Sequence, residues 1–357
     1  MPNKYSALIA AFVYTLGSAT MAQESPPIEL TISATHSIAT PWVHTLKHYF
    51  VPEFTRRTKL LPNSQTYQWI EIYGGALSKW HNGLEVTEIG LTDVGWVGTL
   101  WEPAKMPLQN ITYHLPFITD NLGVLVRVYN YIHRVLPAAR EAWLKHNQIY
   151  LGATGIDTYH LLTKFPVNSL ADLKGRKLLA PGPSAVWLQG TGAVPVNGAL
   201  STYYTQLKTG VADGTVSILT GAHPYRIHEV APYITLVGIG AQITGAISIN
   251  LESWQRLSQA EQEILAELGD DYSEKAAEAT TRRYESALAT MLTEGATLNR
   301  LSPDEKQKWI DGLPEYGEQW VTRHESNGLP AGRMLQLLMD GVREAGIQPQ
   351  REWDRYE

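Results

Sequence analysis

The sequence has 357 residues, of which 44% are hydrophobic and 18% charged, with a net charge of −6 and no cysteine. A chain of this length is too long to fold around a single simple hydrophobic core, and it suits two lobes of ordinary domain size. The absence of cysteine excludes disulfides, thiolate metal sites and a cysteine nucleophile. The acidic balance, without a dense run of Lys or Arg, argues against nucleic acid as a partner.

The first 22 residues have the pattern of a cleavable export signal. Lys4 supplies a positive charge, ALIAAFVYTLG is an apolar stretch, and SATMA before Gln23 is a small-residue cleavage site. The apolar stretch is too short to anchor stably in a bilayer. We therefore expect residues 1–22 to be a signal peptide, and a Gram-negative periplasm is the natural compartment, since a lipid anchor would need an N-terminal cysteine.

The next segments predict alternating strands and helices. Residues 28–37 (IELTISATHS) resemble a strand, 42–58 have helical spacing, 66–75 alternate as a second strand, and 93–97 form a buried strand. A similar cycle restarts at residue 147 and includes GRKLLAPG, GAVPVN and ADGTVSI. This order predicts two α/β units in tandem, and so two lobes that face a cleft.

Two helices are predicted in the last hundred residues. The first is long and begins after Ser258, which forms a capping box with Glu261, and it ends before Gly295. Gly269 and Asp270, in its middle, are a place where it could bend. The second helix begins after Ser302, with Pro303 in the first helical position.

Motifs of enzyme chemistry are incomplete in this sequence. HEVAP begins at His228 like a zinc-binding helix, but Pro232 breaks the position of the second ligand. Asp157 and His160 are three residues apart and lack an identifiable nucleophile. We therefore expect no enzyme and no catalytic residue. A secreted hydrolase that uses Asp157 and His160 is the alternative from another class.

The stretch LKGRKLLAPG…GTGAVPVNGALSTYYTQLKTGVADGTVS, at 173–217, carries a resemblance to a known family. It resembles the solute-binding component of tripartite ATP-independent periplasmic (TRAP) transporters, of the dicarboxylate-binding type. Similar segments occur at 36–58, at 70–98 and at LPF from Leu115, so the resemblance covers nearly everything after residue 28. It implies an α/β periplasmic-binding-protein fold of two lobes joined by hinge strands, with the long helix running across both.

The resemblance also implies boundaries and partners. Lobe I is expected at 28–154 plus 243–283, and lobe II at 155–242 plus 284–357. A small organic solute would bind in the cleft, and the closed form would be recognised by the TRAP permease subunits in the membrane. We expect a monomer without a cofactor. A receptor that presents its ligand to a sensor kinase is an alternative of the same fold.

One departure from the family pattern concerns the ligand clamp. The family has Gly-x-Lys-x-Arg, whose arginine binds a ligand carboxylate with two hydrogen bonds. Here Leu179 occupies the arginine's place, and a second family arginine aligns near Tyr159. Lys177 is on the same strand face as Leu179 but roughly 6–7 Å away along the strand. An acidic metal ligand of some family members is replaced by Val216, so we expect no metal.

Three ligand chemistries remain open without this arginine, because a desolvated carboxylate that lacks its partner costs several kcal/mol. The first is a neutral or largely apolar organic solute, which we rank first. The second is an acid held elsewhere, by Arg127, His160 or Lys164. The third is a cation held against Asp157 and aromatic rings.

The ligand-binding residues that we expect come from the inner strand ends of both lobes. For each aromatic residue, packing in the core is an equally good explanation. The candidates are His36 and Trp96 from lobe I, and Tyr159, His160, Leu179, Trp187, Leu200 and Ser217 from lobe II.

Overall fold

The computed structural model describes residues 26–62, 65–180 and 182–356. The expected signal peptide, 1–22, lies outside the described residues. In the described part of the chain, no helix is long and apolar enough to cross a membrane.

The first sheet has five strands in the order β2-β1-β3-β10-β4. Strands β1 (Ile28–Ser33), β2 (Tyr67–Ile72) and β3 (Val94–Val97) are parallel, and β10 (Gln242–Asn250) pairs antiparallel with β3 and with β4 (Gln148–Ile156). One helical segment follows β1: α1 (Pro41–Thr45), a π turn (Leu46–Phe50) and α2 (Val51–Thr58). Helix α3 (Gly83–Glu88) precedes β3. These elements match the predicted strands and helix.

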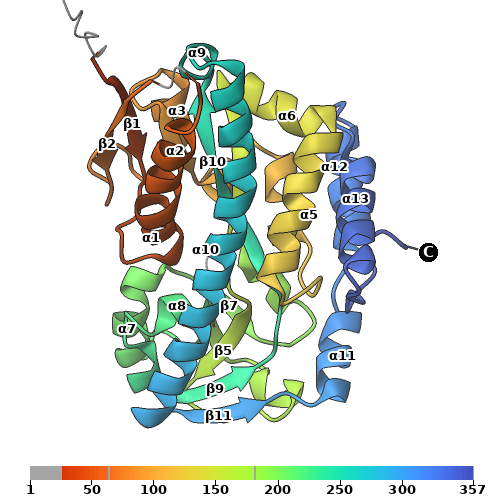
Figure 1. Cartoon of the computed structure of the whole chain (residues 1–357). Helices are drawn as coiled ribbons and strands as arrows, with labels where there is room; N and C mark the ends of the chain where they lie inside the picture. Colours follow the sequence, from red (N-terminus) through yellow and green to blue (C-terminus); the bar gives the residue numbers. More distant parts are fainter. Residues whose placement is uncertain (1–25, 63–64, 181, 357) are drawn as a thin grey trace, which may run out of the picture.

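The second sheet has six strands in the order β11-β9-β5-β8-β6-β7. Its strands are β5 (Tyr159–Thr163), β6 (Lys177–Ala180), β7 (Val194–Asn197), β8 (Gly214–Ile218), β9 (Tyr233–Leu236) and β11 (Thr297–Arg300). Helices α7 (Leu200–Lys208) and α8 (Leu219–Ala222) belong to the same lobe. Figure 1 shows the two sheets one above the other, so the expected two-lobed α/β fold is confirmed.

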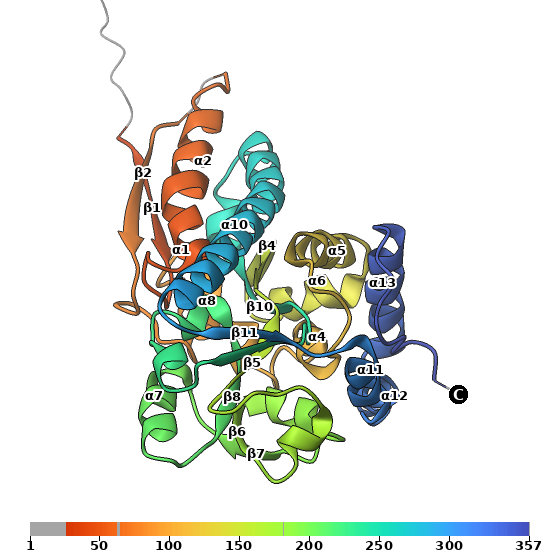
Figure 2. The ribbon, with the colours of Figure 1, turned by 90° about the horizontal axis from the view of Figure 1, so that it is seen from below.

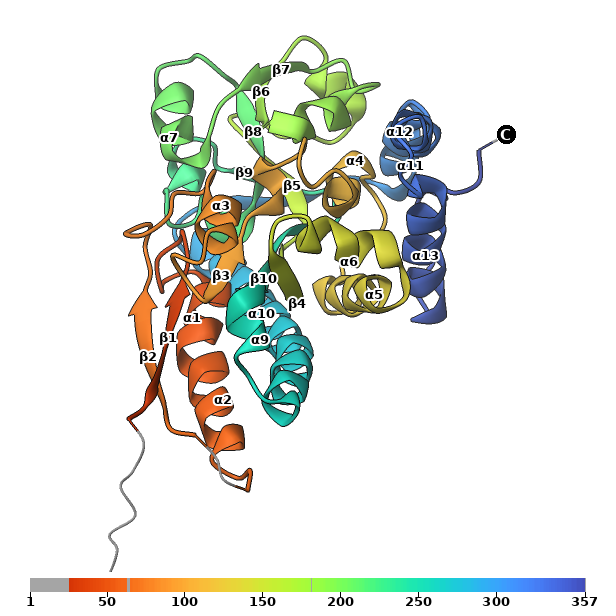
Figure 3. The ribbon, with the colours of Figure 1, turned by 90° about the horizontal axis from the view of Figure 1, so that it is seen from above.

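The remaining helices surround the first sheet and the C-terminal side of the molecule. They are α4 (Ile111–His114), α5 (Leu122–Val135), α6 (Pro137–Leu144), α9 (Leu251–Gln255), α11 (Pro303–Asp311), α12 (Tyr316–Glu325) and α13 (Ala331–Glu344). Figures 2 and 3 both show α13 beside α5, and the two helices are in contact. The C-terminal segment therefore reaches back to the lobe that contains β4. The exact lobe boundaries stay a prediction.

The long helix α10 (Gln259–Thr293) spans both lobes. Its predicted capping box is present, since the Ser258 hydroxyl accepts from the Glu261 N–H and the Glu261 carboxylate accepts from the Ser258 N–H. The helix continues without interruption through Gly269, where the sequence suggested a bend. A side chain there would come within 2.1 Å of the Leu151 carbonyl oxygen, so Gly269 serves the close approach of α10 to β4.

Several segments pass from one sheet to the other. Residues 157–158 join β4 to β5, and 237–241 join β9 to β10. Helix α10 packs on β4 in one lobe and on α8 in the other. These crossings form the hinge of the molecule.

Candidate functional site

Tyr159, at the start of β5, belongs to a group of three aromatic rings in contact. Its ring meets the edge of the Trp187 ring at 5.0 Å between centroids, and Trp187 stacks on Tyr113 of α4 at 5.9 Å. The hydroxyl oxygens of Tyr159 and Tyr113 are 3.3 Å apart, and the Trp187 indole N–H donates to the Tyr113 carbonyl at 2.9 Å. The predicted residues Tyr159 and Trp187 therefore lie together. No sequence pattern pointed to Tyr113.

Leu179 lies on the opposite face of the second sheet from Tyr159. It pairs with Thr215 of β8, while Tyr159 pairs with Ile218, and the pairs in this ladder alternate between the two faces. Leu179 is fully buried in a cluster with Leu162, Tyr203 and other apolar residues. Leu200, the first residue of α7, is half-buried and packs on the same cluster. The position of the family's arginine is thus filled by packed apolar side chains.

A second aromatic group lies in the first lobe, around His36 and Trp96. The rings of Trp96 and Trp101 lie 4.9 and 5.9 Å from that of His36, and Trp42 lies 5.3 Å from it. Burial lowers the pKa of His36 to about 4, so its imidazole is neutral at pH 7. The Trp96 indole N–H is buried and has no hydrogen-bond partner within the described residues. We call His36, Trp42, Trp96 and Trp101 the first-lobe aromatic group.

A lysine lies beside this group. The Lys79 ammonium donates to the Gly75 carbonyl at 2.7 Å, and Gly75 in turn donates its N–H to Ala34, two residues before His36. The next residue, Trp80, is 54% exposed and contacts Trp101 at 5.4 Å. The first-lobe aromatic group therefore has an exposed edge with a positive charge nearby.

His160 and Ser217 pair with each other on β5 and β8, so they share the sheet face opposite to Tyr159. The His160 Nδ1 accepts from the N–H groups of Val237 and Gly238, at 3.2 and 3.1 Å, so this nitrogen carries no proton. The Nε2–H therefore donates to the Tyr284 hydroxyl at 3.0 Å. Burial, with the nearby charges of Lys306 and Arg300, lowers the pKa of His160 to about 3. The neutral ring is a structural part of the hinge.

The Asp157 carboxylate is also held by hydrogen bonds from the protein. Its carboxylate accepts from the N–H groups of Leu219 and Thr220, at 2.9 and 3.2 Å, and from the Thr220 hydroxyl. Burial raises the pKa of Asp157 to about 6, although these hydrogen bonds oppose the shift. Within the described residues, Asp157 and His160 are not hydrogen-bonded to each other, and each is held by other partners. This geometry gives the alternative hydrolase no support.

The other two suggested carboxylate partners lie away from Tyr159. Lys164 follows the far end of β5, about 16 Å along the strand from Tyr159, and its ammonium donates to the Ala212 carbonyl at 2.9 Å. Arg127 is exposed on α5. The predicted site residues thus divide into three places: the first-lobe aromatic group, the face of Tyr159 and Trp187, and the opposite face with Leu179, Leu200, Ser217 and His160.

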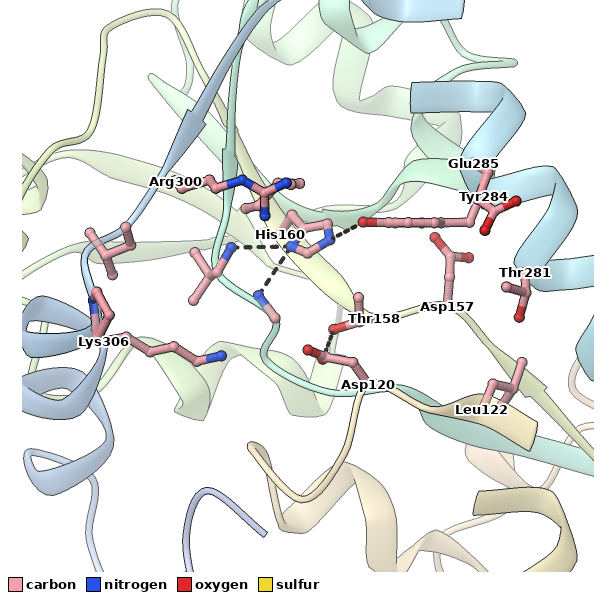
Figure 4. Close-up of a pocket in the computed structure, with 15 residues that line it drawn as sticks. Asp120, Leu122, Asp157, Thr158, His160, Thr281, Tyr284, Glu285, Arg300 and Lys306 are labelled. Atoms are coloured by element: carbon pink, nitrogen blue, oxygen red, sulfur yellow. Dashed lines mark hydrogen bonds between the residues drawn. The ribbon is translucent and has the colours of Figure 1, made fainter. Parts of the chain in front are cut away.

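A cavity of about 470 Å³ lies at the hinge, on the His160 side (Figure 4). It is lined by Asp120, Leu122, Asp157, Thr158, His160, Leu236, Val237, Gly238, Thr281, Tyr284, Glu285, Arg300, Leu301, Pro303 and Lys306. The sequence identified only Asp157 and His160 among them. No group of three or more His, Asp or Glu side chains in the described part of the chain could hold a metal ion.

Comparison with known sequences places the chain in a family. The family of bacterial extracellular solute-binding proteins, family 7 (DctP), matches residues 75–322, and the chain belongs to this family. A curated solute-binding protein of Sulfitobacter sp. (strain NAS-14.1) is 33% identical over 102 residues, which cover 28% of this chain and 31% of that protein. The chain thus spans about a third of that relative's length.

Comparison with solved structures supports the same fold. A TRAP periplasmic solute-binding protein from Desulfovibrio salexigens, in an open complex, matches 90% of this chain and 98% of its own, with a TM-score of 0.79 and 21% identity. One from Rhodoferax ferrireducens with copurified benzoate has a TM-score of 0.75 and 16% identity, covering 89% and 98% of the two chains. One from Bordetella bronchiseptica with bound mandelate has a TM-score of 0.73 and 20% identity, covering 89% and 100%. The expected resemblance is confirmed.

Proposed function

We propose that this protein is a periplasmic receptor that captures a small organic solute between its lobes and delivers it to the membrane subunits of a TRAP transporter. The family match and the TRAP proteins with the same fold support this function. Closure around the ligand would be driven by the ligand's higher affinity for the closed form. Export by residues 1–22 and action as a monomer are part of the proposal, and no catalytic step is needed.

The ligand that the residues favour is neutral or largely apolar, with an aromatic or otherwise flat body. The observation that carries this proposal is the burial of Leu179 among apolar side chains, where the family pattern has a carboxylate-binding arginine. Rings such as those of His36 and Trp101 offer stacking surface on the first-lobe side. A buried carboxylate near Leu179 would lack a partner and be disfavoured by several kcal/mol.

A second candidate ligand is an aromatic acid, and Lys79 is the observation that favours it. Its ammonium bonds only to a carbonyl among the described residues, and the next residue, Trp80, contacts Trp101 of the first-lobe aromatic group. Two proteins of the same fold were solved with benzoate and with mandelate, both of which combine a ring with a carboxylate. In this case Lys79, rather than a second-lobe arginine, would hold the acid.

The test is a thermal-shift screen of the mature protein with matched pairs of ligands, such as benzyl alcohol with benzoate and 1-phenylethane-1,2-diol with mandelate. A ligand at a hundred times its dissociation constant stabilises the protein by about 2.7 kcal/mol, which gives a measurable rise in melting temperature. Hits among neutral members that remain in Lys79→Gln support the first candidate. Hits among acids that disappear in Lys79→Gln support the second.

Two controls make the screen specific. Trp101→Ala removes a ring of the first-lobe aromatic group and should abolish the shift, whereas Trp254→Ala, on α9 outside that group, should not. Chromatography after binding should return the ligand unchanged, because a receptor releases what it binds. Recovery of a cleaved product would overturn the proposal in favour of an enzyme, and the absence of any hit across a broad solute panel would count against a receptor.

A further inference from the structure

The hinge cavity is bounded by segments that connect the two lobes. Thr158 lies on the β4–β5 crossing, Val237 and Gly238 on the β9–β10 crossing, and Tyr284 on α10. The opposite wall is the passage from β11 to α11, which carries Arg300 and Lys306. The cavity lies on the sheet face of His160 and not on that of Tyr159, and neither Tyr159 nor Trp187 lines it.

Two positive side chains of this cavity form no salt bridge within the described residues. The side chains of exposed Arg300 and half-buried Lys306 donate no hydrogen bond to any described residue, and Asp120 is the acidic group that acts on Lys306. The half-buried Lys306 ammonium lies over the Phe117 ring, 5.7 Å from its centroid. Burial lowers the pKa of Lys306, with Asp120 opposing the shift. A partly desolvated ammonium without a direct hydrogen-bond partner is unfavourable, and an anionic ligand group in contact with Arg300 and Lys306 would relieve this cost.

Acidic side chains limit what this anion can be. Asp120 lies near Thr158, whose hydroxyl donates to it at 2.5 Å, and Glu285 on α10 has no ionic partner within the described residues. In Figure 4, Arg300 and Lys306 lie on one side of His160, and Asp157 and Glu285 lie on the other. A ligand with two negative charges would be repelled by these carboxylates. A ligand with one negative and one positive end would match both sides.

We propose that the hinge cavity is a second binding site, for a small zwitterionic amino carboxylate. Its carboxylate would bind to Arg300 and Lys306, and its ammonium would face Asp157 and Glu285 on the other side of His160. The lining of the cavity contains no residue of the first-lobe aromatic group, and Leu236 and Tyr284 connect it to the cluster that contains Leu179. Since its walls come from segments that must shift when the lobes move, an occupant would favour one lobe arrangement and change the affinity for the transported solute reciprocally.

The experiment is isothermal titration of the mature protein with ω-amino carboxylates of two to five methylene groups, each compared with the matched alkyl carboxylate and alkylamine. We expect one amino carboxylate to bind with one-to-one stoichiometry and at least tenfold more tightly than both matched compounds. Equal binding of the alkyl carboxylate would overturn the zwitterion assignment. The absence of binding by the whole series would overturn the site.

Variants locate the binding. Lys306→Gln should weaken it at least tenfold and Lys306→Arg should largely restore it, with folding verified by circular dichroism. Lys308→Gln is the matched control, because Lys308 lies on the same helix, is 65% exposed and is ion-paired with Glu305. Trp101→Ala should leave this binding unchanged. Loss in Trp101→Ala together with full binding in Lys306→Gln would assign the amino carboxylate to the site between the lobes and overturn the proposal, without harm to the receptor function.

Discussion

Leu179 and Thr215 lie opposite each other on β6 and β8, and the Thr215 hydroxyl donates to the Leu179 carbonyl at 3.0 Å. The hydrogen bond holds the two strands together at the place where the family pattern has an arginine. The Leu179 side chain points into the cluster that contains Leu162, Tyr203 and Leu207. The position that holds a carboxylate-binding arginine in the family pattern is therefore occupied here by a leucine packed among apolar side chains.

Restoring the arginine should destabilise the protein. Leu179→Arg would place a guanidinium in a fully buried apolar cluster, and we expect the free energy of unfolding to fall by about 3 kcal/mol or more. Leu179→Met, which conserves volume, should cost less than about 1.5 kcal/mol. Urea unfolding followed by circular dichroism measures both. An arginine variant with unchanged stability and new affinity for carboxylates would show that this position faces an open site.

The close approach of α10 to β4 predicts that Gly269 does not tolerate a side chain. A methyl group there would come within 2.1 Å of the Leu151 carbonyl oxygen, and the neighbouring backbone would have to move. Although alanine favours helices, Gly269→Ala should lower the free energy of unfolding by about 1–3 kcal/mol. Glu274→Ala, exposed on the same helix, is the control and should be neutral in the same urea titration. Increased stability of Gly269→Ala would contradict this contact.

Buried His133 predicts a loss of stability in acid. Its Nδ1–H donates to the Tyr129 carbonyl at 3.0 Å, and its Nε2 accepts from the Trp143 indole N–H at 3.3 Å, so a second proton has no acceptor. Burial lowers the pKa of His133 to about 4, below the 6.5 of the unfolded chain. The unfolded state therefore binds more protons, and the stability present above pH 6.5 is lost as the pH falls toward 4.

The pKa shift of His133 sets the size of the stability loss, which is about 3 kcal/mol for this fully buried group. Urea titrations at pH 7, 6, 5 and 4.5 should show stability falling over this range. His133→Phe cannot titrate, so it should be less stable at pH 7 but show a flatter pH dependence. An identical slope in the variant would mean that other groups, such as His36 or His114, cause the acid sensitivity.

The indole N–H of Trp187 should contribute measurably to stability. Trp187→Phe keeps an aromatic ring against Tyr113 but removes the 2.9 Å hydrogen bond to the Tyr113 carbonyl. We expect a loss of about 1–3 kcal/mol, since the buried carbonyl loses a donor and part of the ring volume is lost. Trp254→Phe, which has no such hydrogen bond within the described residues, should change stability less. Similar losses from both variants would argue against the role of this bond.

Local patterns predicted much of the fold. A strand-like segment at 28–37 located β1, alternation at 66–75 located β2, the stretch GRKLLAPG contains β6, and the Ser258–Glu261 box marked the start of α10. These features depend on residues close together in the chain, where side-chain alternation and capping act. The family resemblance supplied the two-lobed arrangement that local patterns do not contain.

The site was predicted less completely, because the relative orientation of side chains from different strands depends on how those strands pair in the sheet. Tyr159 and Leu179 were chosen from family positions, but the pairing of β5, β6 and β8 places them on opposite faces of one sheet. His160 was chosen as a ligand partner, and its two backbone donors come from residues more than seventy positions later. The hinge cavity has walls from distant segments and leaves no local signal. The roles of the eight chosen residues in ligand binding stay a prediction.

The close backbone contact at Gly152 and Gly269 fixes one end of α10 rigidly to the first lobe. A side chain at either glycine would collide with main-chain atoms of the partner element, so the contact is made by backbone atoms and not by flexible side chains. The other end of the 35-residue helix places Ala287 and Met291 in the core of the second lobe. We therefore expect lobe opening to bend the helix between its two anchored ends, so that its stiffness would limit how far the lobes separate.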